Sequence, residues 1–101
     1  MRSRRIWMGA RESEELSRLV AEFGEAMRQK LWRKFREGYR GWDDDSDREH
    51  VIENLRTKLK DHVRRYEAGD RWQLVDIANL AAMLWRFEVR GAKAAEGGSG
   101  P

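Results

Sequence analysis

The 101-residue chain is long enough for one small domain, and its 40% hydrophobic and 39% charged residues are typical of a soluble, helical protein. It has no cysteine, which excludes disulfides and thiolate chemistry and favours a reducing, cytoplasmic location. No apolar run approaches the roughly 20 residues that a membrane-spanning helix needs, so we expect no membrane contact. The net charge of +3, with acidic and basic residues interleaved, argues against a nucleic-acid partner.

The N-terminal third of the chain predicts a basic arm followed by a long helix. Residues 1–12 form the arm, and the helix runs from about Ser13, as its N-cap, to Glu37. Gly38 follows in the position where glycine commonly ends a helix. The apolar residues recur at steps of three and four and form one stripe, which comprises Leu16, Leu19, Val20, Phe23, Ala26, Met27, Leu31 and Phe35.

A loop over residues 39–45 precedes the second predicted helix. Ser46 and Glu49 have the spacing of a capping box, in which the serine is the N-cap and the glutamate reaches back to it. The apolar residues of this helix lie on one face, and the helix ends at Ala68-Gly69.

Asp70 and Gln73 form a second cap signature, which starts a third helix that runs to about Val89. This helix is apolar on nearly every side, so we expect it in the middle of a bundle or at a subunit interface. Residues 91–101 lack large apolar side chains and predict a disordered tail. The predicted fold is therefore an all-α bundle of three main helices over residues 13–90. Because so small a domain buries only about two-thirds of its unfolded surface, we expect oligomerisation to complete it, as a dimer or tetramer.

Several residues follow one another in an order known from one protein family. The most specific block is Gly69-Asp70 followed by Asp76-Ile77-Ala78-Asn79. Looser matches precede it at Phe23, Ala26-Met27, Lys30-Leu31, Gly41-Trp42, Asp45-Ser46 and Leu55. Over residues 23–85 the chain resembles the MazG-like all-α nucleotide pyrophosphohydrolases, and most closely their small phage-type members.

The resemblance implies a dimeric helical bundle that converts nucleoside triphosphates to monophosphates and pyrophosphate. Family members hold Mg²⁺ with an E-x-x-E pair on one helix and an E-x-x-D pair on the next, a donor set that suits a hard cation. The corresponding positions here are Lys58 and Asp61, then Gln73 and Asp76. Asp61 and Asp76 are thus the candidate catalytic and metal-binding residues, and Lys58 is a candidate for holding phosphate charge in place of a metal.

Asn79 lies one turn from Asp76 and faces the same way, and burying both groups is costly unless something pairs with them. They either contact a metal or a ribose-phosphate group, or they are satisfied by each other, by a helix end or by an arginine at an interface. Trp42 either stacks on a base or closes the end of the bundle. Arg40 and Lys34 are candidate phosphate contacts, and His62 is expected at the edge of the core rather than as a ligand.

The leading interpretation is a cytoplasmic nucleotide-binding protein, phage or cellular in origin, with Mg²⁺-dependent pyrophosphohydrolase activity in question because Lys58 and Gln73 replace carboxylates. The alternative is a non-catalytic oligomeric helical scaffold or interaction protein, in which the third helix and the tryptophans serve a subunit interface. A small nucleic-acid-binding module is the least favoured.

Overall fold

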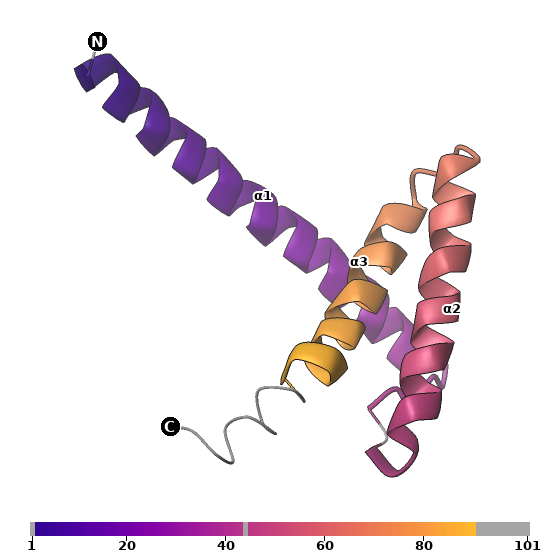
Figure 1. Ribbon diagram of the computed structural model, residues 1–101. Helices are drawn as coiled ribbons and strands as arrows, with labels where there is room; N and C mark the ends of the chain where they lie inside the picture. The colour runs from indigo at the N-terminus through magenta and orange to yellow at the C-terminus, as the bar shows by residue number, and fades with distance from the viewer. Residues whose placement is uncertain (1, 44, 91–101) are drawn as a thin grey trace, which may run out of the picture.

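The computed structural model of the chain, which describes residues 2–43 and 45–90, confirms the predicted all-α fold (Figure 1). Three α-helices account for most of it, and the described part has no strand. In chain order the elements are α1 (Arg2–Arg36), the 3₁₀ turn η1 (Asp45–Asp47), α2 (Arg48–Glu67), α3 (Gln73–Trp85) and the π-helical segment η2 (Arg86–Arg90). The predicted tail at 91–101 lies outside the described residues.

Helix α1 is longer than the sequence pattern predicts. It begins at Arg2 rather than at Ser13, so residues 2–12 continue the helix and Ser13 lies in its interior. The prediction that Ser13 caps the helix is therefore wrong. Residues 2–12 contain no proline, and the one glycine among them, Gly9, costs a helix only about 1 kcal/mol relative to alanine. No residue in this segment therefore prevents the helix from beginning at Arg2.

The predicted helix ends at Gly38 and Gly69 are confirmed. Both glycines have positive φ angles, 100° and 114°, which residues with a side chain rarely adopt. At the first, the Tyr39 amide donates to the Lys34 carbonyl at 3.1 Å. At the second, the Asp70 amide donates to the Arg65 carbonyl at 3.1 Å. These bonds satisfy carbonyls that a helix end otherwise leaves unpaired.

Neither of the two predicted N-terminal caps occupies the N-cap position of its helix. Ser46 lies inside η1 and α2 begins at Arg48, so the capping box does not start this helix. The 3₁₀ turn takes up the residues that the box would need as its first turn, and Asp47 occupies the N-cap position without a side-chain hydrogen bond. The Asp70 signature does not start α3 either, because the helix begins at Gln73 with Trp72 in the N-cap position. The Asp70 carboxylate instead accepts from the Trp72 amide at 3.1 Å and from Gln73 Nε2 at 2.9 Å in the turn that precedes the helix.

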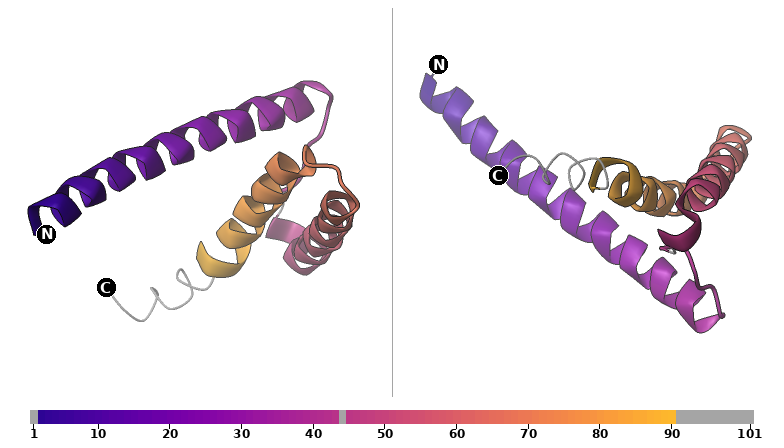
Figure 2. Two further views of the ribbon diagram at one scale, coloured as in Figure 1. Left: turned by 90° about the horizontal axis from the view of Figure 1, so that it is seen from above. Right: turned by 60° about the horizontal axis from the view of Figure 1, so that its bottom comes forward.

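Helix α3 lies between the other two helices and contacts both, as expected for its apolar character (Figures 1 and 2). It packs against α2 as an antiparallel hairpin and crosses α1. The buried apolar residues of the described chain form one small cluster of Leu55 from α2, Leu80 and Leu84 from α3, and Phe87 from η2.

The molecule is elongated, because the N-terminal half of α1 projects beyond the α2–α3 hairpin (Figures 1 and 2). Its radius of gyration is 17.9 Å, whereas a compact domain of this length has about 13 Å. The predicted apolar stripe is present on this projecting half and faces solvent: Leu16, Leu19 and Val20 are 61%, 58% and 71% exposed. No described helix is both long and apolar enough to cross a membrane.

The polar side of α1 carries ion pairs within the helix. The Arg28 guanidinium donates to both carboxylate oxygens of Glu25, at 2.7 and 3.0 Å, and these hydrogen bonds lower the pKa of Glu25 below its ordinary value. Arg18 and Glu15 form a second pair at 3.0 Å. Charged pairs on one side and an apolar stripe on the other make α1 amphipathic well beyond its contact with α3.

The small core makes the stability sensitive to single truncations on α3. We expect Leu84→Ala, at a side chain only 7% exposed, to lower the free energy of unfolding by about 2–5 kcal/mol because it removes buried surface and leaves a cavity. Leu74→Ala on the same helix, at a residue 42% exposed, is the matched control and should cost much less. Urea unfolding at one fixed protein concentration measures both. Equal losses for the two variants would contradict this location of the core.

Candidate functional site

Asp76 has its partner on another helix. Its Oδ2 lies 3.6 Å from Lys30 Nζ on α1, and the two side chains are 17% and 29% exposed. A partly buried ion pair is screened less by water than a pair on the open surface. The ion pair of this carboxylate therefore links α3 to α1.

Asn79, one turn along α3, also contacts α1. The residue is 4% exposed, and its Nδ2 donates to the backbone carbonyl of Met27 at 3.3 Å. Its Oδ1 is buried and has no hydrogen-bond partner in the described part of the chain. Asp76 and Asn79 thus meet Lys30 and Met27 at matching three-residue spacings in opposite chain directions. These two contacts fix the point at which α3 crosses α1.

Asp61 is paired within its own helix. Its carboxylate lies 2.8 Å from Arg65 and 4.0 Å from Arg64, and the side chain is about half exposed. Lys58, one turn earlier on α2, is exposed to solvent. Ion pairs of this exposed, i to i+4 kind contribute only about 0.3–0.5 kcal/mol.

A contact between His62 and Gln73 joins α2 to the first turn of α3. The His62 ring donates from Nδ1 to Oε1 of Gln73, whose Nε2 in turn donates to Asp70. This contact places the helix segments that carry Lys58 and Asp61 against the start of α3. The helix segments of α2 and α3 that carry Lys58, Asp61, Gln73 and Asp76 are therefore neighbours, at the end of the hairpin nearest Gly69.

The side chains at these positions do not form a set that suits Mg²⁺. Among the described residues, no group of three or more His, Cys, Asp or Glu side chains is placed to hold a metal ion. Asp61 is engaged by Arg65, Asp76 by Lys30, and the Gln73 oxygen by His62. A hard octahedral cation prefers several free oxygens in one place, which these side chains do not provide.

The aromatic candidate Trp42 has a packing role. Its ring meets Phe87 edge-on, with centroids 6.0 Å apart and an interplanar angle of 83°. The Arg86 guanidinium lies 5.5 Å from the centre of the Trp42 ring. Trp42 thus closes the core over η2, which is the second of the two interpretations that the sequence allows.

The two basic candidates lie at the C-terminal end of α1. The Arg40 guanidinium lies 3.6 Å above the Phe35 ring and donates to the Phe35 and Tyr39 carbonyls. Lys34 lies over the Tyr39 ring at 4.8 Å and 3.9 Å from Glu37. Arg40 and Lys34 are thus used locally to finish α1. Within the described chain, no hydrogen bond, ion pair or ring contact links them or Trp42 to Asp61 or Asp76.

The structure shows two things that the sequence analysis did not single out. One is Lys30 as the partner of Asp76. The sequence does contain a signal for this pairing: Lys30 interrupts the apolar stripe between Met27 and Leu31 and so predicts an acidic residue on the facing helix. The other is a surface hollow on the N-terminal half of α1, lined by Gly9, Glu12, Ser13, Leu16, Ser17 and Val20. All six residues come from one helix, which cannot enclose a small molecule by itself.

Comparison with known proteins found no matching family model, no matching curated protein and no matching solved structure.

A structural role for Asp76 predicts unequal effects of removing the two aspartate charges. Asp76→Asn should lower the free energy of unfolding by about 1 kcal/mol, because it leaves Lys30 half-buried without its counter-charge. Asp61→Asn, on the exposed face of α2, should change it by less than about 0.5 kcal/mol. Chemical denaturation of both variants tests this. An Asp76 variant more stable than the parent would instead indicate a carboxylate kept for function at the expense of stability.

Proposed function

We propose that the protein is a self-associating helical module whose subunit interface is the exposed stripe on the N-terminal half of α1. The observation that carries this proposal is the solvent exposure of Leu16, Leu19 and Val20 on a helix whose opposite side is charged. A contiguous apolar stripe rimmed by polar residues is typical of a surface that another protein covers.

The part of α1 that α3 covers also supports an interface on this stripe. Met27 and Lys30 lie on the same face of the helix as Leu16 and Val20, since they continue the steps of three and four residues. At Met27 and Lys30 this face is covered by α3, whereas at Leu16 and Val20 it is open. The stripe is therefore one packing surface, of which the chain itself covers only the C-terminal part.

The expected strength of association follows from the area that is available. Fully burying a leucine or valine side chain is worth about 1.5–3 kcal/mol, so three such residues from each of two copies contribute roughly 5–12 kcal/mol at their present exposure. Association costs about 4–15 kcal/mol in lost freedom of motion. Since the two terms are similar, the oligomer should depend visibly on protein concentration.

The mass in solution tests the proposal. Light scattering after size-exclusion chromatography should give a multiple of the 12.0 kDa chain mass, rising with concentration. A Leu16→Gln, Val20→Gln double variant should shift the protein to the monomer mass, because glutamine keeps the helix but removes the apolar surface.

The matched control is Glu14→Gln with Arg18→Gln, which places two glutamines on the side of the same turns opposite the stripe and removes only exposed charges. This control should keep the parent mass. A parent protein of monomer mass at every concentration would overturn the proposal.

Nucleotide binding is a second candidate function. It is supported by the resemblance to the MazG-like proteins and by the contact of His62 with Gln73, which brings the helix segments carrying the family's positions side by side. Lys58 is exposed there and has no hydrogen-bond or ion-pair partner in the described chain. In this proposal Lys58 contacts a phosphate group as a point charge, and any Mg²⁺ arrives with the nucleotide.

Thermal unfolding with nucleoside triphosphates, with and without Mg²⁺, tests this second candidate. A ligand at a hundredfold excess over its Kd adds about 2.7 kcal/mol of stability, which raises the Tm of a domain this small by several degrees or more. Lys58→Ala should abolish the rise, and Lys60→Ala, an exposed lysine two residues away, should preserve it. An unchanged Tm with every nucleotide would remove this candidate and leave the self-association proposal standing.

A further inference from the structure

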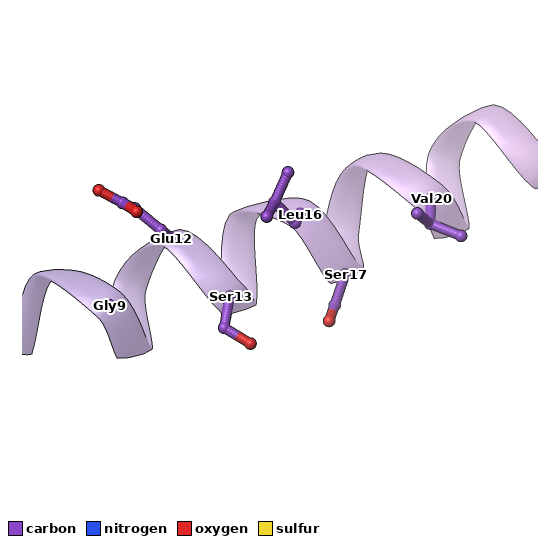
Figure 3. Close-up of a pocket in the computed structure, with 6 residues that line it drawn as sticks. All are labelled: Gly9, Glu12, Ser13, Leu16, Ser17 and Val20. Carbon is purple, nitrogen blue, oxygen red and sulfur yellow. The ribbon is translucent and has the colours of Figure 1, made fainter. Parts of the chain in front are cut away.

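The hollow on α1 has an ordered pattern of small and large residues. Gly9, Ser13, Leu16 and Val20 follow one another at steps of four, three and four residues, so they lie in one row along the helix. Figure 3 shows them on a single stretch of α1. The first two members of the row are small and the last two are branched and apolar.

We infer that a second copy of the chain occupies this row, with the two α1 helices antiparallel. The inferred register aligns Val20 of one copy with Gly9 of the other, and Leu16 of one copy with Ser13 of the other. Each large side chain then faces a small one. A parallel pair would place Gly9 against Gly9 and Val20 against Val20, which leaves a gap at one level and crowding at another. The inference rests on the proposed function and adds the direction and register of the two helices.

The position of α3 favours the same direction. Because α3 covers the row at Met27 and Lys30, a partner helix can use only the part of α1 on the N-terminal side of these residues. In a parallel pair both α2–α3 hairpins would lie at the same end of the shared surface and compete for one space. In an antiparallel pair the hairpins lie at opposite ends, and each one meets the N-terminal half of the other copy's α1, which projects beyond the α2–α3 hairpin in Figure 1.

Single cysteines test this arrangement, because the chain has none of its own. We would prepare Gly9→Cys, where an added side chain meets no atom within 4 Å, and Val20→Cys, then oxidise each alone and as an equimolar mixture. Disulfides need Cα atoms about 4.4–6.8 Å apart. In the antiparallel pair, residue 20 of one copy lies opposite residue 9 of the other. The two copies of residue 20 are therefore eleven residues apart, about 16 Å along the helix. The control mixture pairs Gly9→Cys with Arg18→Cys, on the charged side of α1.

The expected result is a covalent dimer in the Gly9→Cys and Val20→Cys mixture and none, or a trace, in the other samples. Efficient cross-linking of Val20→Cys alone would show a parallel pair and overturn the inference while self-association stands. Absence of cross-linking in every sample, with light scattering still showing a dimer of each variant, would overturn the register. A parent chain that is monomeric at all concentrations would overturn both the inference and the proposed function.

Discussion

The packing of α3 between α1 and α2 is the contact on which the rest of the structure depends. Leu80 and Leu84 of α3 supply half of the buried cluster, and Phe87 follows them directly in η2. Helix α3 can take this place because it is apolar on nearly every side, whereas α1 and α2 each have only one apolar face. Helix α2 therefore buries its apolar face against α3, whereas α1 places only the part of its face around Met27 and Lys30 there. With so small a core, the chain has little stability to spare, and each buried side chain accounts for a large part of it.

The crossing of α1 and α3 depends on polar contacts as much as on apolar ones. Asp76 meets Lys30, and Asn79 donates to the Met27 carbonyl, although its own oxygen remains buried without a partner. A buried polar atom without a partner costs about 1–3 kcal/mol, so the asparagine is poorly suited to stability alone. A directional contact of this kind does select one register between two helices, as polar residues do at helix interfaces in coiled coils. The same residues that suggest a metal or phosphate site in the sequence thus serve to align two helices.

The shape of the molecule links this crossing to the proposed function. Because α3 covers α1 around Met27 and Lys30, the helix continues as an amphipathic rod without a partner in the described part of its own chain. Amphipathic helices of this length gain most of their stability from packing, not from intrinsic helix propensity. In the proposed dimer, the association of two such rods stabilises α1 and covers the stripe at the same time. The hairpin of α2 and α3 remains outside this contact, so nucleotide binding at its far end is compatible with it.

The sequence by itself determined the helical class, the apolar stripe of α1, the central place of α3 and the helix ends at Gly38 and Gly69. These features depend on periodicity and on the backbone freedom of glycine, which are local properties of the chain. It did not determine where α1 begins, since Ser13 is an acceptable cap but nothing ahead of it prevents a longer helix. The tertiary structure alone decided the partners of Asp61, Asp76 and Asn79, because a side chain's spacing on one helix does not say which helix it will face. It also decided that the stripe is covered at Met27 and open at Val20, since that depends on where α3 crosses.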